Sequence, residues 1–467
     1  MTKISRREFI TRSTALGATG AIGGVAGGGL LLSSCGADKA DDGKVKYEPL
    51  QSDIPVIIPE TGDKAIDGKE LKIGIIGCGD RGSGAMENML EAADGLKVVA
   101  MADLFPDRLE RLRKRIGGDK FHQTVDDSRI YYGFDAYQKL CDNKDIDIVM
   151  VTTPSIFHAY HVKYAIETGH HVFCEKAAGI DPASCKTFFA AIKLAQANKL
   201  CIQTGAQRHH DRNYIESYRH IREGMIGRIT SGVVKWNQSS FTTRKRRPGW
   251  TDMEYMLRDF FSWNWLCGDH VIDQLVHNID VFTWFSHLNP ISVVGMGSQL
   301  QRRAGDIFDN FALDIVYPGG VRVNAQARQI DNCANDIGET IVGTKGIWTS
   351  YDHTIRDLDG NEVWKYDYEA QNAKFKQNNA YVLEHMDLIN HIRSGKSYTY
   401  EAERLVVASL TGAMGRESAY TGKNIKWDEY LASSQSLLPE NLHLGNIENF
   451  AKIYVPPRMG TLAPDPS

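Results

Sequence analysis

The sequence lacks closely paired cysteines, a strong charge of either sign and, beyond its first 35 residues, any long apolar run. Its eight cysteines form no Cys-x-x-Cys pair, so neither a zinc ribbon nor a disulfide scaffold is indicated. The 54 basic and 58 acidic residues nearly balance, which argues against a broad basic face for nucleic acid. The 467 residues have a globular composition, and at roughly 100–200 residues per domain they predict two to four domains.

The first 34 residues are typical of a targeting signal rather than of folded structure. Arg6-Arg7 before Phe9 resembles a bacterial twin-arginine signal, and a weakly apolar stretch rich in glycine and alanine follows. Leu32-Ser33-Ser34-Cys35 resembles a lipobox, which predicts cleavage before Cys35 and lipidation of its thiol. A leader cleaved elsewhere, or a simple signal anchor, is the alternative.

These features predict a lipoprotein that is exported by the twin-arginine route and faces the periplasm or cell envelope. We expect it to touch the membrane only through the anchor at Cys35, because no second apolar run of about 18 residues exists. Residues 35–68 are polar and interrupted by prolines, which predicts a linker. Twin-arginine export carries folded proteins, so any cofactor is expected to be loaded in the cytoplasm and held tightly.

A glycine-rich motif follows the first strand-like segment of the body. Residues 71–76 form a short apolar run typical of a buried parallel strand, and Gly77-Cys78-Gly79-Asp80-Arg81-Gly82 comes directly after it. In such a GxGxxG, the first glycine permits a tight turn, the second lets the backbone approach a pyrophosphate, and the third lets the helix pack on the strand. The expected helix over 83–93 would direct its free N–H groups at the phosphates.

An acidic residue ends the second predicted strand. Residues 96–102 lead to Asp103, whose carboxylate could accept the ribose hydroxyls of an adenosine and would repel a 2′-phosphate. The position therefore favours NAD, although Arg108 lies close enough to leave NADP possible. The alternative is an Asp103 that caps the helix beginning near Pro106.

Strands and helices continue to alternate as far as residue 204, which predicts a doubly wound parallel sheet over residues 69–207. Ligands of such sheets bind at the carboxyl ends of the strands. The polar residues and turns at those ends are therefore candidate cofactor contacts: Thr153, Pro154, His158, Glu175 and Lys176.

The pattern changes after Gln207. Strand-like segments separated by short turns predict an α+β domain with an open, mainly antiparallel sheet over residues 208–425, followed by a C-terminal arm over 426–467. A helical pattern over 267–280 would place Asp273 and His277 on one face, four residues apart.

Across about residues 70–425, this ordered set of motifs resembles the Gfo/Idh/MocA oxidoreductase family, to which glucose–fructose oxidoreductase and inositol dehydrogenase belong. The resemblance implies a Rossmann domain followed by a domain whose open sheet backs the active site and often forms the oligomer contact, so a homo-oligomer is expected. One feature departs from the family: its usual Glu-Lys-Pro is Glu175-Lys176-Ala177 here.

The resemblance assigns catalytic roles to three residues. Lys176 corresponds to the catalytic lysine, His277 to the general base and Asp273 to the carboxylate beside it. An imidazole suits proton removal from a hydroxyl near neutral pH, and a lysine can donate a hydrogen bond to the same oxygen. The cofactor contacts are then predicted to be Gly77, Gly79, Asp80, Arg81, Gly82, Asp103, Thr153, Pro154, His158, Glu175 and Lys176.

Substrate contacts are predicted at His210, Trp236 and His270, with a solvated turn as the alternative for His210. A metal cluster of His270, Asp273 and His277 matches no ligand set well, so no metal is expected.

Three functions compete for this chain. The first is an NAD(P)-dependent dehydrogenase or oxidoreductase of a sugar or glycoside hydroxyl. The second is a glycoside hydrolase that oxidises its substrate transiently and recycles bound NAD. The third is a non-catalytic sugar-binding lipoprotein, which the retention of Lys176, Asp273 and His277 disfavours.

Overall fold

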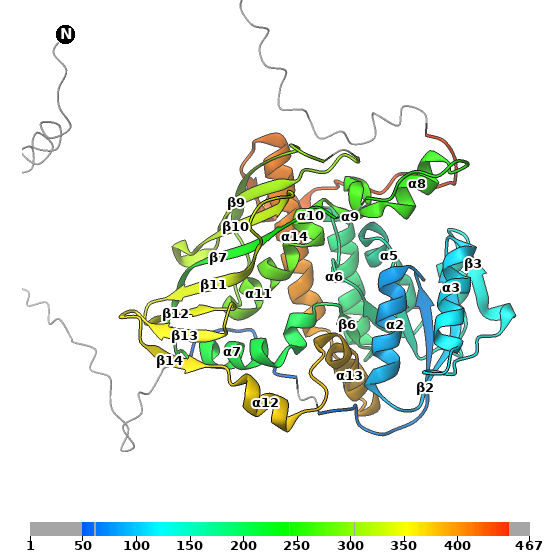
Figure 1. The fold of residues 1–467 in the computed structure, drawn as a ribbon, viewed down its shortest axis with the longest axis horizontal. Coiled ribbons are helices and arrows are strands. Elements are labelled where there is room, and N and C mark those ends of the chain that lie inside the picture. The colour runs from blue at the N-terminus through cyan, green and yellow to red at the C-terminus, as the bar shows by residue number, and fades with distance from the viewer. Residues whose placement is uncertain (1–48, 60–61, 242, 303, 448–467) are drawn as a thin grey trace, which may run out of the picture. The chain divides into compact units, whose positions relative to one another are not determined.

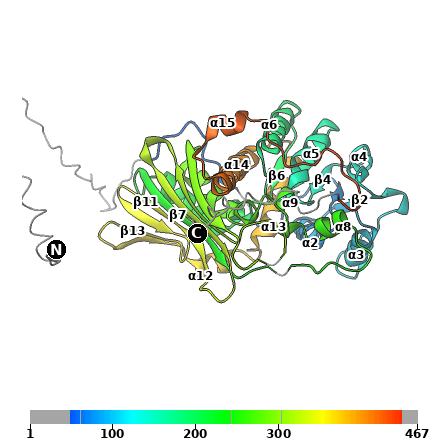
Figure 2. The same ribbon diagram turned by 90° about the horizontal axis from the view of Figure 1, so that it is seen from above.

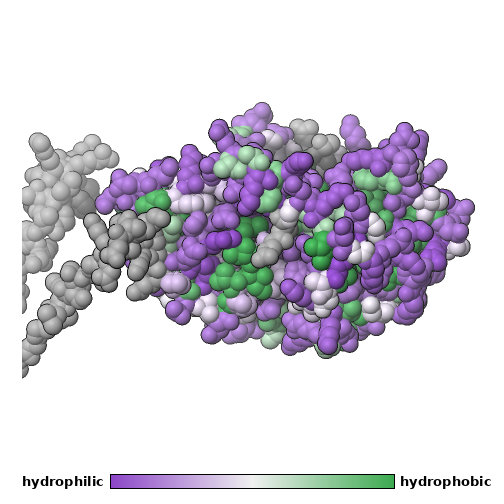
Figure 3. All heavy atoms as spheres, turned by 90° about the horizontal axis from the view of Figure 1, so that it is seen from below, coloured by the Kyte–Doolittle hydropathy of each residue, from purple (hydrophilic) through white to green (hydrophobic). Residues whose placement is uncertain are grey.

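The computed structural model describes residues 49–59, 62–241, 243–302 and 304–447. The predicted signal, the lipidation site at Cys35 and the last 20 residues of the predicted arm lie outside these ranges. Among the residues described, no helix combines the length and the apolar character that crossing a membrane requires. Figure 3 shows one side of the surface as largely hydrophilic, with a few hydrophobic patches.

The first half of the body is built on a six-stranded parallel sheet (Figure 1). The strand order is β3-β2-β1-β4-β5-β6, so the direction of winding reverses between β1 and β4. The central strands are buried on both faces, which explains their continuous apolar runs. The strands are β1 (Leu71–Ile76), β2 (Leu96–Asp103), β3 (Ile130–Tyr132), β4 (Ile148–Val151), β5 (His171–Cys174) and β6 (Ile202–Thr204).

Helices connect these strands, which confirms the predicted doubly wound arrangement. The last of them begins with a capping box in which the Asp181 carboxylate accepts the Ser184 N–H at 2.7 Å, and Pro182 occupies its first turn. The helices are α2 (Asp80–Ala92), α3 (Pro106–Gly117), α4 (Ala136–Cys141), α5 (Ser155–Glu167) and α6 (Pro182–Ala197).

The second half carries a nine-stranded sheet whose order is β14-β13-β12-β11-β7-β10-β9-β8-β15. All neighbouring strands are antiparallel except β7 and β10, so the predicted mainly antiparallel sheet is confirmed. The strands are β7 (Ile229–Gln238), β8 (Ser292–Ser298), β9 (Asn310–Val316), β10 (Arg322–Gln329), β11 (Asp336–Gly343), β12 (Gly346–Thr349), β13 (Thr354–Asp357), β14 (Glu362–Lys365) and β15 (Ile425–Lys426).

One face of this sheet packs against helices α11 (Val276–Ser286) and α14 (Tyr400–Thr421) (Figure 2). Alternate residues of β9 are buried there, as expected for a strand with one covered face. The remaining helices are α7 (Arg212–Arg222), α8 (Asp252–Arg258), α9 (Asn264–Cys267), α10 (His270–Asp273), α12 (Tyr368–Lys374), α13 (Ala380–Arg393) and α15 (Trp427–Ala432).

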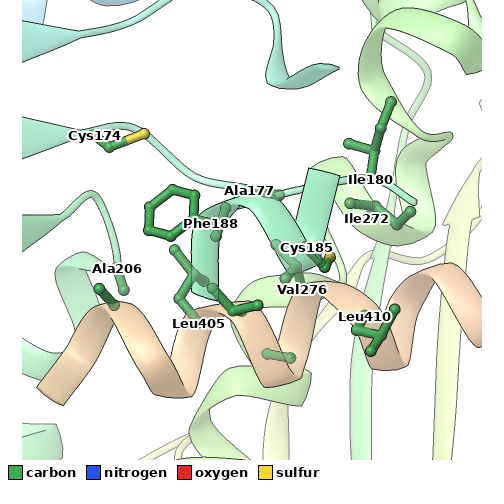
Figure 4. Close-up of a cluster of buried hydrophobic side chains, with 14 of the residues drawn as sticks. Cys174, Ala177, Ile180, Cys185, Phe188, Ala206, Ile272, Val276, Leu405 and Leu410 are labelled. Atoms are coloured by element: carbon green, nitrogen blue, oxygen red, sulfur yellow. The ribbon is translucent and has the colours of Figure 1, made fainter. Parts of the chain in front are cut away.

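The two halves of the body share their hydrophobic core. Helix α13 returns to the first half and packs against α2. Its Leu383 and Met386 belong to the same buried cluster as Ile73 and Ile75 of β1. A second cluster joins Ala177 and Phe188 of the first half to side chains of the second, as Figure 4 shows for Ile272, Val276 and Leu405. Sequence periodicity could not reveal this return, because it identifies helices and not their partners.

The described parts of the predicted linker and arm also pack on the body. The Leu50 N–H donates to the Arg222 carbonyl and the Ala65 N–H to the Ala92 carbonyl, each at 2.9 Å. At the other end of the chain, the Leu437 N–H donates to the Asp181 carboxylate at 2.6 Å. These three bonds attach polar segments that otherwise stay largely exposed.

The packing of α13 can be tested with a pair of leucines. Leu383 is fully buried, so Leu383→Ala should lower the free energy of unfolding by about 2–5 kcal/mol. Leu358 is 62% exposed, and Leu358→Ala should change the free energy of unfolding by less than about 0.5 kcal/mol. Urea denaturation followed by circular dichroism measures both, and equal effects would contradict the assigned packing.

Candidate active site

A cavity of about 780 Å³ opens at the carboxyl ends of β1, β2, β4 and β5, where the winding reverses. Pockets of roughly 300–1,000 Å³ are usual for small-molecule and cofactor sites, and this edge of a parallel sheet is where they form. The lining comes from both halves of the chain. It includes the glycine loop, Asp103, Thr153, Pro154, Glu175 and Lys176 of the first half, and Phe241, Arg244, Leu257, Arg258, Asp259, Phe260, Phe261, Asp273, Leu438 and Leu442 of the second.

The glycine loop has the shape that a pyrophosphate needs. Gly77 adopts a positive φ of 98°, and a Cβ there would lie 2.7 Å from the Thr152 carbonyl. A Cβ on Gly82 would lie 2.0 Å from the Gly77 oxygen. A Cβ on Gly79 would meet no protein atom within 4 Å, so the space in front of it is open. Since α2 begins at the next residue, its N-terminal N–H groups add the anion-binding character that a dinucleotide requires.

Asp103 lies at the edge of this loop and is 6% exposed. Its carboxylate accepts the Cys78 N–H at 2.6 Å and the Phe105 N–H at 2.9 Å, which ties the end of β2 to the glycine loop. Burial raises the pKa of this carboxyl, while Arg108 opposes the shift. Phe105, and not Asp103, is the residue that precedes α3. Lone pairs of the carboxylate remain for ribose hydroxyls, so the residues fit an adenine dinucleotide.

Arg81 and Glu175 form an ion pair in the wall of the cavity. The Arg81 Nε lies 2.5 Å from Glu175 Oε1, and the guanidinium stacks 4.8 Å from the ring of Tyr381. Tyr381 begins α13, so the returning helix also reaches the site. Tyr381 could not be predicted from local sequence, because its position depends on a contact between residues 300 apart.

Lys176 and Asp273 meet from opposite halves of the chain. The Lys176 ammonium donates to the Asp273 backbone carbonyl and lies 3.1 Å from Asp273 Oδ1. Gln274 Nε2 donates to the other carboxylate oxygen at 2.7 Å. Both Lys176 and Asp273 line the cavity. The carboxylate is therefore held by two donors while it positions the ammonium.

The predicted continuous helix over 267–280 is wrong, and the break lies at this contact. In an unbroken helix the His277 N–H would donate to the Asp273 carbonyl, but Lys176 occupies that oxygen. The His277 N–H donates to the Gln274 carbonyl instead, at 3.2 Å, and the chain forms α10 and α11 separately. Before α10, Gly268 and Asp269 both have positive φ.

His277 follows this break and is 7% exposed. Its ring stacks on Trp236 of β7 at 5.5 Å, and within the described residues its imidazole makes no hydrogen bond to another protein group. Burial lowers the pKa of His277 well below its usual value, and Lys176, Arg208 and Arg81 lower it further. The imidazole is therefore neutral near pH 7 and able to accept a proton.

Three other predicted site histidines lie behind the cavity wall. His158 is buried, and its ring nitrogens lie 2.6 Å from the Thr153 carbonyl and 2.7 Å from the Ala177 carbonyl. It supports the turn after Lys176, where the family has proline, and the prediction that it contacts the cofactor is corrected.

His210 bonds to Glu401 at 2.6 Å, and His270 lies 3.0 Å from Asp269 and 3.1 Å from the Phe308 carbonyl. Both are fully buried, which corrects their prediction as substrate contacts. Trp236 is half-buried beside His277 and stays a prediction.

The sequence also gave no indication of Arg208. Its guanidinium lies 5.4 Å from the ring of Tyr214 and 5.6 Å from that of Trp236, and it pairs with Glu339. Glu339 in turn accepts from Tyr214 and from Asn278. Only the folded sheet brings Arg208 beside Trp236.

Comparison with known proteins agrees with this geometry. Residues 71–205 match the family described as "Oxidoreductase family, NAD-binding Rossmann fold", and residues 214–349 match the "GFO/IDH/MocA C-terminal domain". Together these matches cover more than half of the chain. The protein belongs to the Gfo/Idh/MocA family. Its first half is therefore an NAD-binding domain, as the glycine loop and Asp103 predict.

Individual relatives are more distant. Inositol 2-dehydrogenase of Salmonella typhimurium is 29% identical over 46% of this chain and 54% of its own length. "Glycosyl hydrolase family 109 protein 1" of Bacteroides thetaiotaomicron is 32% identical over 32% of each chain. The structure of scyllo-inositol dehydrogenase from Lactobacillus casei with bound NAD(H) and scyllo-inositol matches with a TM-score of 0.58 at 20% identity, covering 78% of this chain and all of that one. The chain thus spans about half the length of the inositol 2-dehydrogenase and about a third of the glycosyl hydrolase family 109 protein. The match to the solved structure shows the fold.

The lowered pKa of His277 can be measured directly. The folded group is protonated only well below pH 6.5, whereas the unfolded group binds its proton near pH 6.5. As the pH falls below about 6.5, the unfolded state binds more protons and the stability contributed by this group decreases. Titration of the His277 ring by NMR, assigned with His277→Gln, should show a neutral ring at pH 6. A midpoint at or above 6.5 would contradict the burial.

Proposed function

We propose that the protein is an NAD-dependent oxidoreductase that oxidises a hydroxyl of a sugar or glycoside, with NADP as a possible substitute. The observation that carries the proposal is the meeting of Lys176 and Asp273 at the cavity, with the neutral His277 just beyond the same break in the helix. This arrangement places a donor and a base from different halves beside the site of the cofactor.

The residues have separate tasks in such a reaction. A bound nicotinamide supplies the hydride acceptor. The neutral imidazole of His277 accepts the proton of the substrate hydroxyl. The Lys176 ammonium has three N–H groups, of which Asp273 engages two, so one is left to donate to the substrate oxygen. Asp273 acts by holding that ammonium in place.

Two observations support a sugar as the substrate. The half-buried ring of Trp236 stacks on His277, and an indole face suits the C–H face of a sugar ring. Relatives with related sequences or folds are named as inositol dehydrogenases, and one was solved with scyllo-inositol. We therefore place the substrate ring between Trp236 and the Lys176 side of the cavity.

A glycoside hydrolase that recycles bound NAD is the second candidate. It is favoured by the 32% identity to the protein named as glycosyl hydrolase family 109. Such an enzyme would oxidise a hydroxyl transiently, eliminate the aglycone, add water and reduce the sugar again. The same base and donor would serve both reactions, so the site does not distinguish them.

Product analysis separates the candidates. Purified protein that carries its nucleotide would be incubated with a panel of sugars and aryl glycosides, and the products analysed by mass spectrometry. A ketosugar together with reduced cofactor supports the oxidoreductase. Free sugar and aglycone without net reduction support the hydrolase. Neither product from any panel member would favour the sugar-binding lipoprotein.

The assigned roles predict the behaviour of three variants. His277→Ala and Lys176→Ala should each lower turnover by about 10²–10⁴-fold while retaining bound nucleotide. Because both act on one oxygen, the double variant should lose less than the product of the two effects. His220→Ala is the control, since this half-buried histidine of α7 packs against Trp364 of β14, away from the cavity lining. Near-normal turnover in His277→Ala would show that the base is another residue.

The cellular location forms a separate part of the proposal. Export by the twin-arginine route and lipidation of Cys35 are supported by the Arg6-Arg7 pair and the lipobox-like residues before Cys35.

A homo-oligomer through the second sheet is supported by exposed apolar side chains on its strands, including Val294, Met296 and Ile347.

The anchor predicts a simple fractionation result. Cys35→Ser should move the protein from the membrane to the soluble periplasmic fraction, because a lipid chain is the only proposed membrane contact. Immunoblotting of separated fractions and labelling with a radioactive fatty acid measure the change. A Cys35→Ser protein that stays with the membrane would place the anchor elsewhere.

A further inference from the structure

One wall of the cavity comes from segments of the second half that the assigned reaction does not use. Helix α8 and the residues after it contribute Leu257, Phe260 and Phe261, and the segment after α15 contributes Leu438 and Leu442. Across the cavity lie Asp103, Phe105 and Arg108. Since Asp103 is the ribose-binding carboxylate of the fold, this wall faces the adenosine end of the site.

A single arginine fastens this wall to the nucleotide-binding half. The two terminal nitrogens of Arg258 lie 2.8 and 3.1 Å from the two carboxylate oxygens of Asp107 in the first turn of α3. Its Nε donates to Glu254 at 2.8 Å, and its guanidinium lies 3.9 Å over the ring of Phe105. The Arg258 side chain is 15% exposed and that of Asp107 is 61% exposed, so the pair is bidentate but open to water on the aspartate side.

Further bonds hold the same wall in place. The Arg244 guanidinium donates to the Asp80 carboxylate at 2.7 Å, and the Arg244 backbone N–H donates to the Asp259 carboxylate at 2.6 Å. Together these bonds link α2 to the residue after α8. The C-terminal segment is tied to α8 as well, because the Met253 N–H donates to the Gly445 carbonyl at 3.1 Å. Its other end bonds to Asp181 through the Leu437 N–H at 2.6 Å. The wall is thus anchored on both sides of the cavity.

We propose that residues 251–261 and 433–447 form a cover over the adenosine half of the cofactor site, fastened by Arg258 and Asp107. The cover lets the dinucleotide leave only when this pair separates, and Arg258 is a positioning residue that acts through the cover. The inference rests on the proposed function for the identity of the ligand as an adenine dinucleotide. In this proposal, these residues retain the cofactor while the folded protein is exported.

The test measures dissociation of nucleotide from the full-length holoprotein. Protein loaded with NADH is mixed with excess NAD, and the loss of energy transfer from tryptophan to bound NADH gives the release rate. Arg258→Ala and Asp107→Asn should each release NADH at least about tenfold faster than the unaltered protein, because this bidentate, charge-assisted pair fastens the cover to α3. Arg258→Lys should fall between, since lysine keeps the charge but not the bidentate contact.

Arg115→Ala provides the matched control. Arg115 also makes a bidentate pair, with Glu87, but both residues lie within the nucleotide-binding half and neither lines the cavity. Its release rate should equal that of the unaltered protein. Thermal unfolding in the absence of nucleotide checks that each variant folds, and Asp107→Asn supplies a second route should Arg258→Ala fail this check. Release from Arg258→Ala and Asp107→Asn at the unaltered rate would overturn the cover.

The outcome is independent of the proposed reaction. Nucleotide release needs no substrate, so a protein that oxidises no sugar but releases NADH faster in both variants supports the cover and contradicts the function. Sugar oxidation with unchanged release rates would support the function and contradict the cover. If the cover acts only by retention, turnover of Arg258→Ala should recover when NAD is added in excess, whereas a catalytic defect would persist.

Discussion

The ammonium group of Lys176 joins the two halves of the chain at the point where their chemistry has to meet. It binds both the backbone carbonyl and the carboxylate of Asp273. That carbonyl lies at the end of α10, and His277 follows the break between α10 and α11. The Lys176 charge also helps to lower the pKa of His277. This one interaction therefore links Lys176 to Asp273 at the break in the backbone, and it adds to the effect of burial on the pKa of the proposed base.

This contact is possible because the two halves share a core. Ala177, directly after Lys176, is buried with side chains of the second half, and α13 packs its Leu383 and Met386 against the first sheet. His158 holds the Ala177 carbonyl from behind. A lysine on a loop between independent domains would lose this rigidity, and a base and a donor that must share one oxygen depend on it.

Local sequence predicted the elements whose physics is local. The glycine loop, the strand ending at Asp103 and the alternation of strands and helices follow from backbone freedom, burial and periodicity, and the structure agrees. Arg208 and Tyr381 could not be predicted, because each reaches the site through contacts between distant segments. His210 and His270 were misjudged for the same reason: each is buried among polar partners that sequence order does not reveal, Glu401 for the first and Asp269 with Phe308 for the second. The break before His277 depends on Lys176, nearly 100 residues earlier in the chain.

The central claim is that this cavity is a redox centre in which His277 accepts the proton of the substrate hydroxyl and nicotinamide accepts the hydride. The most direct measurement is the near-ultraviolet absorbance of the protein-bound nicotinamide during the first turnover after rapid mixing with a sugar or glycoside. The account predicts that the reduced form appears, lastingly in an oxidoreductase and transiently in a hydrolase. Tight binding of a sugar beside fully oxidised nicotinamide, with no reduced form at any time, would contradict it.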